Sequence, residues 1–174
     1  NDADSWLVSG SVSGRRESQG LTAALATFDA RFDHRFSDTT TTHARIHGEF
    51  GHELDLDQQV ALGGGNGLRG YPYRYANGDR SLLMTLEQRV YTGWYPARLF
   101  RVGGAIFVDI GRVWGDTPEG ADDLGTLRDF GIGLRLANTR SGLGRVIHVD
   151  LAHPLDGDAE ISKVQLLIST EHSF

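Results

Sequence analysis

Apolar and polar residues alternate along most of this chain. In residues 82–91, for example, leucines, a methionine and a valine recur at even positions, whereas Thr85, Glu87 and Arg89 occupy odd positions. Side chains of a β-strand point to opposite faces of a sheet in turn, so a period of two predicts strands with one apolar and one polar face. The pattern therefore predicts an all-β fold built from antiparallel strands.

This alternation occurs in eight segments of the sequence. We expect strands at 5–13, 24–33, 40–62, 82–91, 99–114, 129–136, 147–152 and 162–174. Turns are predicted at 14–20, 35–38 and 93–97, an acidic loop at 116–125, and a bend near 55–57 inside the third segment. Because 174 residues is the length of one domain, we expect residues 1–174 to form a single domain.

Charged residues are confined to one face in the middle of the second to eighth strands. The polar face carries Arg31, Asp33, Arg45, Glu49, Glu87, Arg89, Asp109, Arg135, Asp150 and Glu171, whereas the apolar face carries none. A soluble sandwich or lipocalin-like barrel would hide the apolar face, and an outer-membrane barrel would expose it to lipid. Strands of about 10–15 residues with an arginine-rich polar face favour an antiparallel transmembrane β-barrel.

Composition excludes several other classes of protein. The chain has 17 basic and 23 acidic residues and a net charge of −6, which argues against a nucleic-acid partner. It has no cysteine, so disulfides and thiolate metal sites are excluded. No apolar run approaches the roughly 18 residues of a membrane helix.

Pairs of histidine and carboxylate residues raise the alternative of an outer-membrane hydrolase. His148 lies two positions from Asp150, and His43 and His47 precede Glu49, so acid–base pairs could form on one strand face. Any polar barrel lumen produces such pairs, however. The spacing of His43 and His47 covers about 13 Å on a strand, too far for one metal ion. We therefore expect no enzyme activity, metal or cofactor.

A glycine-rich stretch at 62–73 interrupts the alternation. Its five glycines and one proline exclude a helix interior or a central strand, so we expect a long loop at about 57–80. Leu68, Tyr71 and Tyr73 are large side chains that need a surface to pack on, and Arg69 lies among them. The loop is therefore expected to fold against a wall that supplies a carboxylate to Arg69.

Five short motifs follow one another in the second part of the chain. They are Leu68-Arg69-Gly70-Tyr71, Phe107-Val108-Asp109-Ile110-Gly111, Gly131-Ile132-Gly133-Leu134-Arg135, Val149-Asp150-Leu151-Ala152-His153-Pro154-Leu155 and the terminal Phe174. In this order they resemble the bacterial surface antigen superfamily of outer-membrane assembly and translocation barrels, which includes BamA, TamA and the two-partner secretion translocators. The first sixty residues carry only the general alternation.

The resemblance implies a role for each motif. In this family a long loop folds into the barrel, and the arginine of its Arg-Gly-Tyr tip pairs with the aspartate of the Phe-x-Asp-x-Gly strand. Here this implies that Arg69, with Gly70 and Tyr71, reaches Asp109, which Phe107 and Gly111 flank. Glu87 is a second expected acceptor, because it lies on the polar face of the adjacent strand. Phe174 resembles the family's C-terminal assembly signal.

The resemblance also implies a bacterial outer-membrane location and lipid around the barrel. Unfolded outer-membrane or secreted polypeptides are the implied partners, and catalysis is not implied. A structural or pore-forming barrel without translocation activity is the main alternative.

The strand number leaves the closure of the barrel open. Family members have sixteen strands, whereas a closed eight-stranded barrel is filled by its own side chains and has no room for such a loop. The chain is therefore expected to be the C-terminal half of a longer barrel or one copy in a homodimer that forms one larger barrel. A small barrel with its loop outside is the third arrangement.

Overall fold

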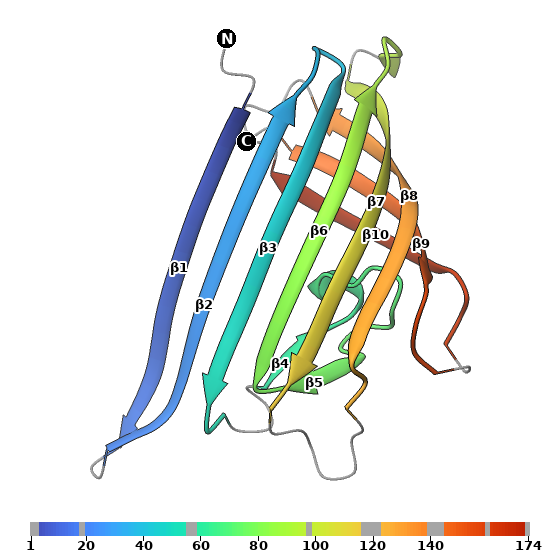
Figure 1. Ribbon diagram of the computed structural model, residues 1–174. Coiled ribbons are helices and arrows are strands. Elements are labelled where there is room, and N and C mark those ends of the chain that lie inside the picture. Colours follow the sequence, from blue (N-terminus) through green and yellow to red (C-terminus); the bar gives the residue numbers. More distant parts are fainter. Residues whose placement is uncertain are drawn as a thin grey trace.

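The chain forms a curved antiparallel β-sheet, as a computed structural model shows (Figure 1). The structure describes residues 4–17, 20–54, 59–96, 99–115, 123–138, 145–158 and 161–172. Among these residues there is no α-helix, and so none that could cross a membrane. The predicted bend at 55–57, most of the predicted acidic loop and Phe174 lie outside the described residues.

Eight strands make up the main sheet, and each pairs with its neighbour in chain order. They are β1 (Asp4–Glu17), β2 (Gly20–Arg35), β3 (Thr40–His52), β6 (Arg80–Tyr91), β7 (Phe100–Trp114), β8 (Thr126–Asn138), β9 (Arg145–Pro154) and β10 (Gln165–His172). Every pairing is antiparallel. The all-β, antiparallel prediction is confirmed.

The predicted turn at 14–20 is wrong in its bounds. The ladder between β1 and β2 continues to the pair Glu17 and Gly20, with a register shift between Arg15 and Arg16. Backbone hydrogen bonds hold a ladder together whatever the polarity of its side chains, so the loss of apolar alternation at residue 14 does not end the strand.

The predicted third strand, 40–62, is also too long. The chain leaves the sheet after His52, where Glu53 adopts a positive φ of 51°. Just before this point, the Gly51 N–H donates to the Asp79 carbonyl at 2.7 Å. The last three residues of the predicted strand instead form β4 (Val60–Leu62), which pairs with β5 (Ala76–Gly78) in a separate small sheet.

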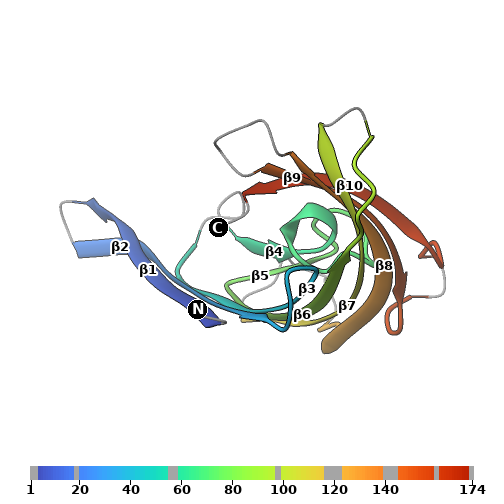
Figure 2. The same ribbon diagram turned by 90° about the horizontal axis from the view of Figure 1, so that it is seen from above.

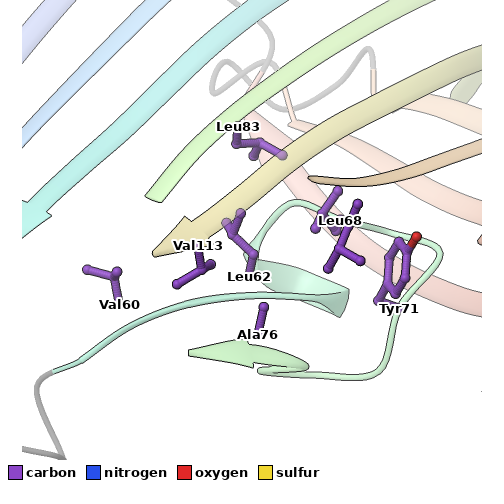
Figure 3. Packing of buried hydrophobic residues seen from close by; sticks show 8 residues of the cluster. Val60, Leu62, Leu68, Tyr71, Ala76, Leu83 and Val113 are labelled. Carbon is purple, nitrogen blue, oxygen red and sulfur yellow. The ribbon is translucent and has the colours of Figure 1, made fainter. Parts of the chain in front are cut away.

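The segment from Gln59 to Asp79, called the inner loop below, lies in the hollow of the curved main sheet (Figure 2). It contains β4, a single 3-10 turn η1 (Gly64–Asn66) and β5. Its apolar side chains pack against β6, β7 and β8 in the one buried cluster of the described chain, shown in Figure 3. The cluster consists of Val60, Leu62, Leu68, Tyr71, Ala76, Leu83, Val113 and Leu127.

The two faces of the main sheet differ in polarity in the sense that the alternation predicts. Charged residues of the concave face are buried under the inner loop, among them Glu87, Asp109 and Arg135. The convex face instead exposes large apolar side chains, including Met84, Leu86, Ile106, Ile110, Phe130, Ile132 and Leu134. A soluble protein would normally bury such a face, so this polarity fits a lipid surrounding.

The main sheet is open. Within the described residues β1 and β10 stand at the two ends of the strand order and do not pair with each other. The inner loop also lies inside the hollow (Figure 2). The structure therefore does not match the third predicted arrangement, a small closed barrel with its loop outside. The structure leaves the two other predicted arrangements, half of a longer barrel and one copy in a homodimer, untested.

Leu86→Arg and Thr85→Arg test the two faces with the same substitution at adjacent residues. Leu86 is exposed on the convex face, whereas Thr85 lines the hollow. Leu86→Arg is expected to lower the free energy of unfolding in lipid vesicles by roughly 2–4 kcal/mol near the bilayer midplane. Thr85→Arg is expected to cost clearly less, because its charge enters a polar cavity. Equal costs at the two positions would contradict this assignment of the faces.

Candidate functional site

The inner loop approaches the main sheet closely where glycine leaves space. A Cβ added to Gly111 of β7 would lie 2.8 Å from Leu62 Cδ1 and 3.2 Å from Leu68 Cδ1. Gly67 has a φ of +119°, and a Cβ there would lie 2.2 Å from Leu83 Cδ2. These two glycines let Leu62 and Leu68 pack flat on β6 and β7, which brings the next residue, Arg69, onto the concave face.

Arg69 binds the carboxylates of three strands. Its Nε donates to Asp109 Oδ2 at 2.7 Å and its Nη2 to Asp109 Oδ1 at 3.0 Å, which makes a two-point contact with β7. Nη1 donates to Glu87 Oε2 of β6 at 2.8 Å and to Asp150 Oδ2 of β9 at 3.3 Å. Only 10% of the Arg69 side chain is exposed. A planar guanidinium suits this position because its fixed donors can serve several acceptors at once.

Two more arginines complete this ion-pair network. Arg135 of β8 donates to both oxygens of Glu87, at 2.8 and 2.7 Å, and also binds Asp150. Arg89 of β6 binds Glu87 from the same strand. The network therefore contains the three cations Arg69, Arg89 and Arg135 and the three carboxylates Glu87, Asp109 and Asp150. Balanced charges of this kind offset much of the cost of removing each ion from water.

Glycines of β8 make room for the network. A Cβ at Gly131 would lie 2.4 Å from Phe107 Cζ, and one at Gly133 would lie 2.4 Å from Arg135 Nη1. Phe107 therefore lies flat, and its ring supports Arg69, whose Cζ is 3.4 Å from the ring centroid. This cation–π contact adds to the ion pairs on a face that is shielded from water.

Gly70 fixes the tip of the inner loop to β8 and β9. Its N–H donates to Asp129 Oδ2 at 3.0 Å. A Cβ at Gly70 would lie 2.5 Å from Asp129 Cβ and 3.0 Å from the Pro154 nitrogen, so no larger residue fits without displacing backbone. Asp129 lies directly opposite Asp109 in the ladder between β7 and β8. The backbone of the tip and the side chain of Arg69 are therefore held by neighbouring carboxylates.

Two tyrosines attach the other side of the inner loop to β8 and to the turn after β9. The Tyr71 hydroxyl donates to the Arg128 carbonyl at 2.8 Å and accepts from the Asp156 N–H at 3.3 Å. The Tyr75 hydroxyl donates to Asp158 Oδ2 at 3.0 Å and accepts from the Asp158 N–H at 3.2 Å. Burial raises the pKa of the Tyr71 phenol, which keeps this donor protonated. We call these contacts the tyrosine clasp.

The tyrosine clasp is tightly packed as well as hydrogen-bonded. The Tyr71 and Tyr75 rings stack with centroids 5.3 Å apart. Gly157 in the turn has a φ of +103°, and a Cβ there would lie 3.1 Å from the Tyr75 hydroxyl oxygen. The turn therefore needs glycine both for its backbone conformation and for the fit of the rings.

The structure brings most of the residues singled out in the sequence into one site. The contact between the inner loop and the concave face includes three residues of the loop and four of the main sheet. They are Arg69, Gly70 and Tyr71 of the loop and Glu87, Phe107, Asp109 and Gly111 of the sheet. The sequence reasoning did not assign Arg135, Asp150, Asp129 or the tyrosine clasp to this site. Arg135 and Asp150 belong to the third and fourth motifs, so a search for charges within those motifs could have found them.

A polar cavity of about 880 Å³ lies beside the inner loop. It is lined from β2 and β3 by Arg31, Asp33, His43, Arg45, His47 and Glu49, and from β10 by Leu167, Ser169 and Thr170. His43 contacts Asp33, and His47 Nδ1 lies 3.1 Å from Asp29 Oδ2. The predicted partner of these histidines, Glu49, makes a longer contact: its Oε2 lies 4.0 Å from His47 Nε2. In the described chain no group of three His, Asp or Glu side chains could hold a metal ion.

Comparison with known families identifies the class of protein. The Omp85 superfamily domain matches residues 17–171, so the chain belongs to the Omp85 superfamily. Members of this superfamily are bacterial outer-membrane proteins of polypeptide assembly and translocation. The predicted resemblance to this superfamily is confirmed. No curated protein matches the chain.

Replacing Arg69 or Asp109 by alanine tests the ion-pair network. Each single change leaves buried charges without their partner, so each is expected to lower the free energy of unfolding by about 3–5 kcal/mol. The double variant is expected to cost much less than the sum, because both residues act through one interaction. Protease cleavage within residues 63–79 of intact membranes should increase in parallel.

The matched control is Arg112→Ala. Arg112 pairs with Asp123 at 3.1 Å, but both side chains are about half exposed, so little change is expected. Strictly additive effects of Arg69→Ala and Asp109→Ala would contradict a direct interaction between the two residues.

Tyr75→Phe tests the tyrosine clasp. Losing the two hydrogen bonds to Asp158 is expected to cost about 0.5–1.5 kcal/mol for each bond and to increase hydrogen exchange in the turn at 155–158. The control is Tyr73→Phe, because Tyr73 is 70% exposed and its change should leave both readouts unaltered. The same effect at the two tyrosines would refute the clasp.

Proposed function

We propose that this chain forms an outer-membrane barrel wall that assembles or translocates polypeptides, with the inner loop as a movable element of its lumen. The observation that carries the proposal is the arrangement of Arg69. Its guanidinium is held by carboxylates of β6, β7 and β9 on the concave face of the main sheet. A polar cavity lies beside this contact. A loop attached in this way joins neighbouring strands of the lumen wall and fills part of the lumen.

The contacts of the inner loop suit a part that is held firmly and can still be displaced. Its anchors are ion pairs and hydrogen bonds, which water or a polar polypeptide can replace, together with a small apolar cluster. An incoming extended polypeptide offers backbone donors like the Gly70 N–H, and its arginine or tyrosine side chains can donate to the same carboxylates as the loop does. Exchange of the loop for a client segment in the lumen therefore costs less than displacement of a fully apolar core.

The surroundings of the chain follow from its two faces. The apolar convex face is proposed to contact outer-membrane lipid, and the polar hollow to contact unfolded outer-membrane or secreted polypeptides. The proposed work is binding and guidance of these clients without catalysis. The net charge of −6 supports a protein client rather than a nucleic acid.

The polar cavity supports a second candidate function, a pore-forming barrel without translocation activity. Its volume of about 880 Å³ and its lining of mixed charge would pass water and small ions once the barrel is closed. This candidate uses the inner loop only as a constriction.

Reconstitution in liposomes distinguishes the two functions. Urea-unfolded outer-membrane barrel polypeptides are added outside, and their folding is followed by the mobility shift of unboiled samples in gels. The proposal predicts folding several-fold faster than with empty liposomes. Arg69→Ala is expected to lose most of this acceleration, because the loop no longer organises the lumen, whereas Arg112→Ala should retain it. Ion conductance in planar bilayers without any acceleration of folding would establish the pore instead.

A further inference from the structure

Asp129 of β8 is fully buried beside the ion-pair network but takes no part in its ion pairs. In the part of the chain that the structure describes, no arginine or lysine forms an ion pair with this carboxyl group. Its Oδ2 accepts the Gly70 N–H at 3.0 Å, whereas no donor of the described chain reaches its Oδ1. A buried oxygen without a donor is costly, so the protonation of Asp129 has to be considered.

The charges of the network are balanced without Asp129. Three arginines already face the carboxylates of Glu87, Asp109 and Asp150. An ionised Asp129 would add a fourth carboxylate at a position where 0% of the residue is exposed. A buried ionisable group that finds no counter-ion becomes neutral instead. The charge balance therefore favours Asp129 as the uncharged acid.

Asp109 lies directly opposite Asp129 and can accept a hydrogen bond from it. The two residues are partners in the ladder between β7 and β8, and their carboxyl groups are within hydrogen-bonding reach of each other. Both oxygens of Asp109 accept from Arg69, which holds Asp109 as the carboxylate. Since Oδ2 of Asp129 accepts from Gly70, its Oδ1 is the oxygen that can carry the proton. One proton between two carboxyl groups replaces their repulsion by a hydrogen bond.

We propose that Asp129 and Asp109 form a proton-binding site that the docked inner loop closes. This inference rests on the proposed movable loop and supplies its regulation. A Cβ on Gly70 would lie 2.5 Å from Asp129 Cβ, so the docked tip packs directly on this carboxyl group and removes it from water. When the loop is displaced, Arg69 leaves as well, but lumen water then solvates both carboxyl groups and screens their repulsion. Docking therefore takes up a proton, and displacement releases it.

The other groups that face Asp129 do not account for such a proton. The inner loop contributes Arg69, which stays charged, and the Tyr71 phenol, which burial keeps protonated. β9 contributes Pro154 as the ladder partner, which does not titrate. In the turn after β9, Asp156 pairs with both donors of Arg128, at 2.8 and 3.0 Å. The pH dependence is therefore assigned to Asp129 with its acceptor Asp109.

Higher pH is expected to displace the inner loop. The docked state binds one proton more than the displaced state, so a rise in pH favours the displaced state. The ratio of displaced to docked loop should increase by up to tenfold per pH unit where only the docked state holds the proton.

A spin label on the inner loop measures this ratio. Gly65→Cys places the label in η1, where an added Cβ meets no atom within 4 Å, and the chain has no other cysteine. The protein is labelled at one pH and reconstituted in lipid vesicles. Its spectrum is then recorded from mildly acidic to mildly alkaline pH, and the slowly and rapidly moving components report the docked and displaced loop.

Asp129→Asn in this labelled protein removes the proton-binding group and keeps its shape. The amide oxygen can still accept from Gly70, and the amide NH₂ can donate to Asp109. The ratio is therefore expected to be independent of pH in this variant. The matched control is Asp123→Asn, because the Asp123 side chain is 60% exposed in its pair with Arg112. This control should keep the pH dependence of the unmodified chain.

Infrared spectroscopy detects the proton itself. The unmodified protein should show the carbonyl stretch of a protonated carboxyl group at neutral pH. This band should disappear as alkaline pH displaces the loop, and it should be absent from Asp129→Asn at every pH.

Three results would overturn the proton-binding site. They are a ratio in the unmodified chain that stays constant or falls as the pH rises, an unchanged pH dependence in Asp129→Asn, and a spectrum of the unmodified protein without the protonated carboxyl band. The first and third need no folded Asp129→Asn variant. Failure of the liposome assay with this pH dependence intact would refute the proposed function alone, and the reverse combination would refute the proton-binding site alone.

Discussion

The buried ion-pair network around Arg69 is the interaction on which the concave face depends. It joins the inner loop to four strands through Glu87 and Arg89 of β6, Asp109 of β7, Arg135 of β8 and Asp150 of β9. Each of these charges would be costly to bury alone, and docking of the loop supplies the guanidinium of Arg69 to both oxygens of Asp109. Gly133 has a physical reason in the same network, since a Cβ there would lie 2.0 Å from Asp150 Oδ1 and 2.4 Å from Arg135 Nη1. Gly131 makes room for Phe107, whose ring supports Arg69.

The main sheet has its polar face inside and its apolar face outside, so it does not bury an apolar face of its own. The inner loop instead supplies most of the buried apolar cluster. Leu62 and Leu68 supply the apolar contact with β6 and β7, and the tyrosine clasp extends the attachment to the turn after β9. The loop thereby stands where a soluble sandwich would have a second sheet. It covers β6 to β9 and leaves the cavity beside β2 and β3 polar.

The sequence by itself determined the strand faces, the place of the loop and the family, because alternation and short motifs are local properties. It also singled out Arg69, Glu87 and Asp109, which lie in contact. Only the tertiary structure decided that Arg69 meets Asp150, 81 positions away, because such contacts depend on strand register and sheet curvature. The ends of β1 and β3 were likewise decided by backbone pairing and by the positive φ of Glu53, which side-chain patterns do not encode.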